Sequence, residues 1–178
     1  MELIRLFVIP LSLAIIAYLT KVVFDLSIVN RDRRFKLYER QLSEFYWPIY
    51  IRLHNNNAVW LRLIEKDSLS NNVGNRIAEK IEDEVILKNH LEIENIIKSS
   101  IQIALPDKIL IRSIKDYLKH VEIYKAIRAV DIKDTYPGQF NAEYPKNFEE
   151  LIENRTIQIQ ERLNKIYKID KPWIPTEQ

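Results

Sequence analysis

The sequence contains no cysteine and only two glycines, Gly74 and Gly138, among its 178 residues. The lack of cysteine excludes disulfides, thiolate metal sites and a cysteine nucleophile. Hairpin-rich β folds need turn positions with positive φ, which glycine or asparagine usually supplies. The scarcity of glycine therefore favours long helices joined by few connections.

A strong net charge is also missing. Removing Arg5, Lys21, Glu2 and Asp25 from the totals of 27 basic and 25 acidic residues leaves 25 and 23 from Arg31 onward. This near-balance argues against a broad electrostatic surface for nucleic acid. The length suits one membrane anchor and one soluble domain with its own core, but not two domains.

The longest uncharged run lies near the N-terminus, from Leu6 to Thr20. If the ammonium group of Lys21 extends outward, the apolar stretch continues to Phe24, and its 19 residues span roughly 28 Å as a helix. That length just crosses a hydrocarbon core. A cleaved signal peptide is the alternative, but Glu2 offsets Arg5 and no small-residue cleavage site follows. We predict a retained anchor.

Basic residues flank the span unevenly, with Arg5 alone before it and a cluster after it. This asymmetry predicts a single-pass membrane protein with a cytoplasmic C-terminal domain. The same cluster is expected to contact anionic lipid headgroups, each basic residue contributing on the order of 1 kcal/mol. The residues assigned to that contact are Arg31, Arg33, Arg34 and Lys36.

Lys21 and Asp25 lie four residues apart, on one face of the expected membrane helix. Ionisable groups at membrane depth usually face a partner helix or water. One interpretation places both at the inner interface, where they cost little. The other is a homo-oligomer in which Ser12, Lys21 and Asp25 face a shared axis that forms a pore.

The rest of the chain reads as helical. Neither Gly nor Pro occurs from Leu11 to Trp47, and Pro48 is expected to kink or end the helix near Trp47. Apolar periodicity predicts further helices over about 76–98, 107–129 and 146–168, with a linker at 67–75 and an irregular loop at 131–145. The predicted fold is all-α: a transmembrane anchor (1–29) continuing into a cytoplasmic antiparallel helical bundle (30–178).

Aromatic residues are concentrated just after the predicted stalk. The cluster contains Phe45, Tyr46, Trp47 and Tyr50, and Trp60 follows after a polar break. Aromatic side chains bury large areas, so one interpretation is a core beneath the membrane-proximal helix. The other is a subunit interface, where Trp and Tyr are also enriched.

Residues that could support catalysis or metal binding are sparse. His54, His90 and His120 are scattered, and we predict no metal, no cofactor and no small-molecule substrate. A ribonuclease of the HEPN type needs an Arg and a His four to six residues apart on a helix. Arg112 and His120 are too far apart for this motif, and Asn154 and Arg155 lack the following His.

The N-terminal membrane helix, the basic segment after it, the aromatic stretch QLSEFYWPIY and the HEPN-like sequence ENR occur together in one short chain. This combination resembles the small membrane accessory proteins of type VI-B CRISPR systems. The resemblance implies a divergent HEPN-like helical domain and an oligomeric membrane pore. It also implies antiviral action by membrane depolarisation, alongside an RNA-guided RNase and its RNA.

Three functional hypotheses follow. The leading one is a homo-oligomeric membrane effector whose copies form a pore in bacterial defence. The second is a non-conducting membrane adaptor that recruits a partner. The third is a membrane-tethered HEPN-like ribonuclease, whose residue candidates are incomplete. All three share the membrane anchor, so membrane location alone does not separate them.

Overall fold

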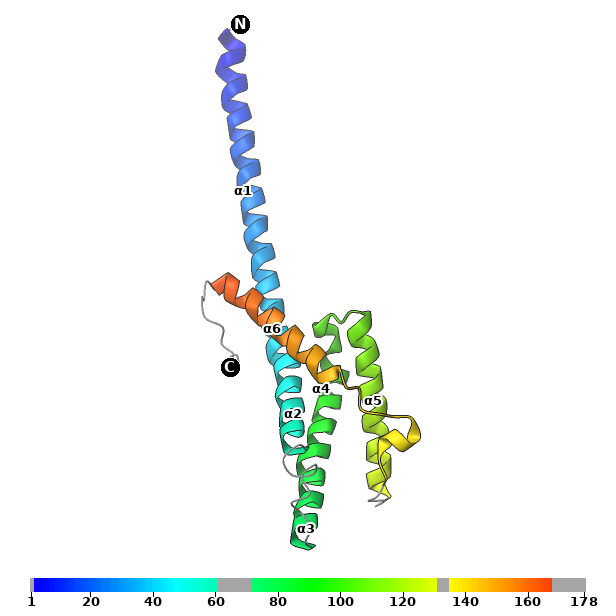
Figure 1. The fold of residues 1–178 in the computed structure, drawn as a ribbon. Helices are drawn as coiled ribbons and strands as arrows, with labels where there is room; N and C mark the ends of the chain where they lie inside the picture. Colours follow the sequence, from blue (N-terminus) through cyan, green and yellow to red (C-terminus); the bar gives the residue numbers. More distant parts are fainter. Residues whose placement is uncertain (1, 61–71, 131–134, 168–178) are drawn as a thin grey trace. The chain divides into compact units, whose positions relative to one another are not determined.

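The computed structural model describes residues 2–60, 72–130 and 135–167 (Figure 1). All regular elements in these ranges are helical, and no strand occurs among the residues described. The predicted all-α class is therefore confirmed. Contacts divide the chain into two compact units, residues 1–37 and 38–178, which we describe separately.

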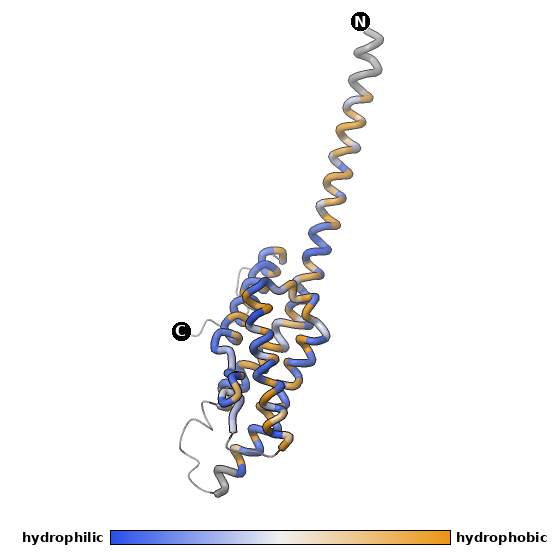
Figure 2. Tube along the Cα trace, turned by 90° about the vertical axis from the view of Figure 1, so that its right-hand side faces the viewer, coloured by the Kyte–Doolittle hydropathy of each residue, from blue (hydrophilic) through white to orange (hydrophobic). Residues whose placement is uncertain are grey.

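Helix α1 (Glu2–Gln41) provides the first unit and continues into the second. Most of its large apolar side chains between residues 11 and 29 are exposed, Leu13 at 61% and Phe24 at 64%. Figure 2 shows this part of α1 as mostly hydrophobic and the following part as hydrophilic. In the described chain, one helical segment, Leu11–Val59, is long and apolar enough to cross a membrane, and none of its apolar window is buried.

Pro48 does not end the helix, contrary to one expectation from the sequence. A π-helical turn, η1 (Leu42–Tyr46), ends two residues before Pro48, and Pro48 is the second residue of α2 (Trp47–Val59). The N–H of Trp47 donates to the carbonyl of Leu42, five residues back. Because proline lacks an N–H and its ring presses on the preceding turn, a wider turn just before it lets the helix continue.

A second long helix consists of three consecutive elements. They are α3 (Asn72–Ile81), the π-helical turn η3 (Glu82–Leu87) and α4 (Lys88–Ala104). The helix predicted over 76–98 is thus present and longer at both ends. Residues 67–71 of the predicted linker lie outside the described residues, and 72–75 are helical.

A tight turn joins α4 to α5 (Lys108–Ala129), close to the predicted bounds. Leu105 ends α4 in the left-handed region with φ 47°. Asp107 then caps α5, because its Oδ1 accepts a hydrogen bond of 2.9 Å from the N–H of Leu110. This cap explains why the helix begins where the sequence predicts it.

The predicted loop at 131–145 contains a short 3-10 helix, η4 (Pro137–Phe140), while its residues 131–134 lie outside the described residues. The last helix, α6 (Phe148–Tyr167), begins two residues after the predicted start at 146. Its last described residue is 167, and the predicted end is 168. Asn141 follows η4 with φ 55°, a conformation that asparagine tolerates better than most residues.

The core of the second unit forms where α2, α4, α5 and α6 pack together (Figure 1). Helix α4 contacts η1, α2 and α5, and α6 contacts η1, α2 and α5. The largest fully buried side chains come from all four helices and η1: Phe45, Ile49, Leu53, Ile93, Ile97, Leu110, Tyr117, Val121, Phe148 and Ile152. This shared core holds the polar groups described next.

Candidate functional site

Side chains predicted to face a membrane or pore all lie on α1 and are exposed. Ser12, Lys21 and Asp25 are exposed, and no ion pair to Lys21 or Asp25 occurs within the described residues. The predicted lipid-contact residues are exposed as well: Arg31, Arg33, Arg34 and Lys36. The fold thus leaves all of these side chains accessible to lipid or to another copy, while their roles stay predictions.

The aromatic cluster separates into buried and half-buried members. Phe45 and Tyr46 are 0% and 2% exposed and lie in the core of the chain itself. Trp47 and Tyr50 are half-buried, and their rings meet edge to face 5.7 Å apart. Trp60 is 37% exposed at the end of α2. The core interpretation therefore fits Phe45 and Tyr46.

Trp47 and Tyr50 tie α2 to α6. Trp47 Nε1 donates to Gln160 Oε1 at 3.4 Å, and the Tyr50 hydroxyl donates to Glu153 Oε1 at 3.2 Å. Each aromatic ring therefore contributes a polar contact as well as apolar area. The hydrogen bonds give these two residues a role within the chain, and an additional role at a subunit interface stays a prediction.

The weak nuclease candidates do not converge on one site. The Arg155 guanidinium pairs with the carboxylate of Asp107, at the start of α5. His120 lies 13 residues farther along that helix, roughly 20 Å at the usual rise per residue. Asn154 and Arg112 are exposed. Within the chain, no Arg–His pair of a HEPN-type site forms among these four residues.

The structure does bring together two histidines that lie far apart in the sequence. The rings of His90, on α4, and His120, on α5, are 5.9 Å apart between centroids. Tyr124 and Tyr144 surround them, with ring centroids 5.9 Å from His90 and 5.4 Å from His120. These rings border a cavity of about 510 Å³, a volume typical of small-molecule sites.

Hydrogen bonds hold both imidazoles in fixed orientations. His90 Nδ1 and the Tyr117 hydroxyl are 2.7 Å apart. His120 Nδ1 is 2.9 Å from the carbonyl oxygen of Ala142, and a carbonyl only accepts, so Nδ1 of His120 is protonated. The Nε2 atoms of both rings make no hydrogen bond to any other described residue.

Burial keeps both imidazoles uncharged at neutral pH. It lowers the pKa of His90 to about 3, and nearby His120 contributes to this shift. It also lowers the pKa of His120, against the opposing effect of the hydrogen bond to Ala142. Burial raises the pKa of the Tyr144 hydroxyl. With Nδ1 protonated, the neutral ring of His120 presents Nε2 as a hydrogen-bond acceptor.

An ion pair at the π-helical turn η3 lies behind two rings that line the cavity, Tyr124 and Tyr136. Arg128 donates to Glu82 of η3, and the Tyr124 hydroxyl donates to the same Glu82 oxygen. The Arg128 guanidinium lies 5.1 Å from the Tyr124 ring centroid and 5.9 Å from that of Tyr136. Short π-helical turns often occur at functional sites, because they redirect side chains that a regular helix would place elsewhere.

Sequence reasoning missed this cavity because its walls come from segments far apart in the chain. One signal was available in α4. His90 lies on the apolar stripe formed by Ile86, Ile93 and Ile97, at steps of four, three and four residues. A histidine on a buried stripe indicates a polar group with a specific partner in the core. The partner itself, Tyr117, could not be inferred from spacing.

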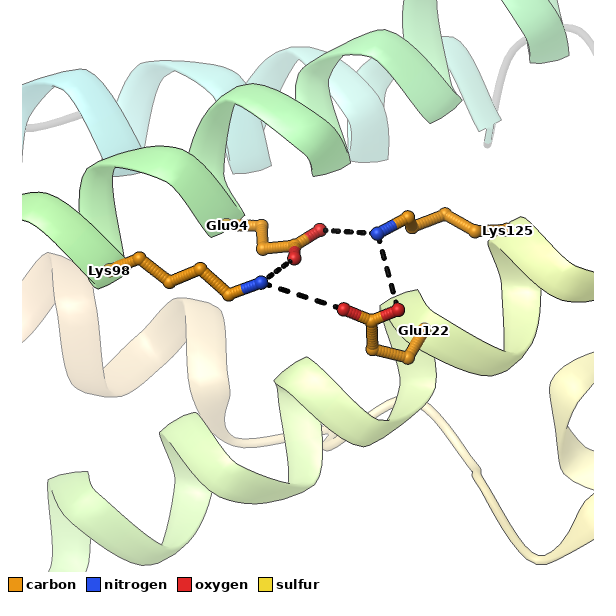
Figure 3. Close-up of polar contacts among 4 residues, drawn as sticks. All are labelled: Glu94, Lys98, Glu122 and Lys125. Carbon is orange, nitrogen blue, oxygen red and sulfur yellow. Dashed lines mark hydrogen bonds and ion pairs between the residues drawn. The ribbon is translucent and has the colours of Figure 1, made fainter.

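A second polar cluster links α4 to α5 on the outside of the core (Figure 3). The side chain of Glu94 is only 5% exposed and accepts hydrogen bonds from Lys98 and Lys125. Both lysines also pair with Glu122, so that four charges alternate around a ring. Burial raises the pKa of Glu94, but the contacts with Lys98, Lys125 and Glu122 together lower it. This ring of ion pairs connects α4 to α5.

No metal centre emerges from the described residues, because no group of three or more potential ligand side chains could hold a metal ion. Comparison with known proteins gives no further assignment: no family model, curated protein or solved structure matches this chain.

Proposed function

We propose that this protein is a single-span membrane protein whose copies assemble into a pore that depolarises the bacterial inner membrane in antiviral defence. In this proposal residues 1–29 form the anchor, and residues 30–178 form a cytoplasmic antiparallel helical bundle related to HEPN domains. Membrane lipid and further copies of the chain are its partners. As the sequence resemblance implies, the pore acts alongside an RNA-guided RNase.

The observation that carries the proposal is the exposure of apolar α1. Between residues 11 and 29 ten large apolar side chains are 44–67% exposed, and Val22 and Ile28 are half-buried. Soluble proteins rarely leave so large a continuous apolar surface in water, whereas a bilayer covers it. The segment satisfies its backbone hydrogen bonds within the helix, as a membrane span must.

Self-assembly is proposed because the span carries charge without an intrachain partner in the described structure. Lys21 and Asp25 lie one helical turn apart and both are exposed. Helices that meet in a membrane can pair such groups across the interface or orient them toward a water-filled axis. One span per chain cannot form a pore alone, so several copies are required.

The test combines subunit counting with leakage. Light scattering of the detergent-solubilised chain, corrected for bound detergent, should give a single molar mass that corresponds to several subunits. The reconstituted protein should discharge the membrane potential of vesicles. The double variant Lys21→Met and Asp25→Leu should weaken leakage, whereas the charge-swapped Lys21→Asp and Asp25→Lys variant keeps a pair and should retain more of it. A monomer or simple dimer would overturn the pore proposal.

A non-conducting adaptor is the second candidate. It is favoured by the second unit, residues 38–178, which has its own core and a cavity of about 510 Å³ that pore formation does not require. A discrete oligomer that stays impermeable in vesicles would support the adaptor and exclude the pore. Neither function needs a catalytic residue. The ribonuclease alternative stays a prediction from the sequence, whose candidate residues do not meet within one chain.

A further inference from the structure

The cavity beside His90 and His120 is built like a binding site rather than like a packing defect. Its volume is about 510 Å³. In a well-packed core few voids are larger than a water molecule. Its lining combines aromatic rings with a small number of polar groups, which is the usual composition of ligand sites. The rings are contributed by Trp60, His90, His120, Tyr124, Tyr136 and Tyr144.

A hydrocarbon ligand fits the cavity poorly. Among the described residues, the Nε2 atoms of His90 and His120 have no hydrogen-bond partner, and both rings line the space. Filling it with an acyl chain would cover these two ring nitrogens without giving them a hydrogen bond. Covering an unsatisfied polar group is costly, so the ligand must offer hydrogen bonds.

A charged ligand fits no better. A cation would compete with Arg128, which already lies over the rings of Tyr124 and Tyr136. An anion would face two uncharged imidazoles and the carboxylate of Glu143, with Lys146 as the single cationic group in the lining. The walls therefore favour an uncharged ligand.

The remaining features define its shape and its polar edge. Aromatic walls favour a flat ring that can stack or meet them edge to face. His120 Nε2 is an acceptor whose direction is fixed by the bond from Nδ1 to Ala142, so the ligand should present an N–H donor to it. Such pre-set orientation lowers the entropy lost on binding.

We propose that this cavity binds a neutral, planar heteroaromatic molecule with N–H donors, of which a nucleobase is the simplest example. The ligand inserts between the aromatic walls and donates a hydrogen bond to His120 Nε2. This binding site lies entirely within residues 38–178, and it rests on neither the membrane span nor pore formation.

Calorimetry of the full chain in detergent micelles, supported by ligand-observed NMR, tests the proposal with three probes. Adenine is neutral, flat and carries N–H donors; naphthalene is flat without donors; adenosine monophosphate carries charge. Adenine should bind saturably and more tightly than either of the others. No saturable adenine binding to the folded chain, or tighter binding of naphthalene or adenosine monophosphate, would overturn the proposal.

Variants at exposed aromatic residues test whether binding occurs in this cavity. Because these side chains are not part of the buried core, replacing them should leave the fold intact. Tyr136 is 49% exposed and lines the cavity, whereas Phe140 is 54% exposed on the neighbouring η4 and does not line it. Tyr136→Ala and Trp60→Ala should each weaken adenine binding about five- to 100-fold, the range expected for one lost stacking contact. Phe140→Ala should leave it unchanged. If all three variants bind adenine with the same affinity, adenine binds outside this cavity.

Discussion

The side-chain amide of Gln41 donates a hydrogen bond of 2.9 Å to the carbonyl oxygen of Ile103, in the last turn of α4. The Tyr46 hydroxyl donates to the next carbonyl, that of Ala104, at 3.1 Å. The last carbonyls of a helix have no partner within it, so side chains must supply one. Residues at the start of the second unit thus complete a helix whose sequence lies about 60 residues away.

Replacing Gln41 with Leu should destabilise the second unit by about 1–3 kcal/mol, because the buried Ile103 carbonyl loses its partner. Thermal unfolding of the detergent-solubilised chain measures the effect. The matched control is Ser43→Ala, since the exposed Ser43 hydroxyl bonds only to a carbonyl of its own helix. Equal melting temperatures for the two variants would contradict the capping role.

Leu105→Gly should stabilise the protein relative to Leu105→Ala. Leu105 has φ 47°, where a residue with a Cβ pays roughly 1 kcal/mol that glycine does not. Because the side chain is 65% exposed, little apolar burial is lost in either variant. We expect a difference of about 0.5–1 kcal/mol, or a few degrees in Tm. A lower Tm for glycine than for alanine would show that the turn tolerates Leu105 without strain.

The sequence predicted the local features of this fold well. Apolar periodicity located α4, α5 and α6, and Asp107 was a sufficient signal for the start of α5 because an N-cap acts on its own helix. The π-helical turns at 42–46 and 82–87 were not predicted. The first precedes Pro48, which signals a disturbed helix without specifying that a π-helical turn absorbs it, and no residue pattern marks the second.

The cavity was missed for a related reason. Its two imidazoles are 30 residues apart in the sequence and meet only because α4 and α5 pack side by side. His120 also needs the carbonyl of Ala142, in the segment after η4, to fix its proton position. Spacing rules find groups that share a helix face, so they could not find this arrangement.

Glu94 should matter more than Glu122, although both belong to the same ring of charges (Figure 3). The Glu94 side chain is 5% exposed and the Glu122 side chain 54%. Glu94→Gln is expected to lower the free energy of unfolding by about 1–3 kcal/mol, because a charge-assisted pair in a buried place is weakened. Glu122→Gln should cost less than about 1 kcal/mol, as exposed ion pairs do. Comparable losses in denaturant titrations would show that the burial of Glu94 has no energetic consequence.

The stability of the second unit should fall in mild acid because of His90. The pKa of His90 is about 3 in the fold and 6.5 in an ordinary environment, owing first to burial and then to His120. Between these values the unfolded chain binds a proton that the folded chain does not. The contribution of His90 is therefore complete above pH 6.5 and is lost as the pH falls toward 3, at no more than about 1.4 kcal/mol per pH unit.

The variant His90→Gln isolates this effect, because glutamine can still hydrogen-bond to Tyr117 but does not titrate. It should be less stable than the unaltered chain at pH 7 and should lose less stability between pH 6.5 and pH 4. His54→Gln is the matched control, since it removes an exposed histidine and leaves His90 in place. Unfolding free energies from denaturant titrations at several pH values provide the measurement. If all three chains show the same slope, the pKa of His90 is not lowered by the fold, and the uncharged state of this cavity wall would be wrong.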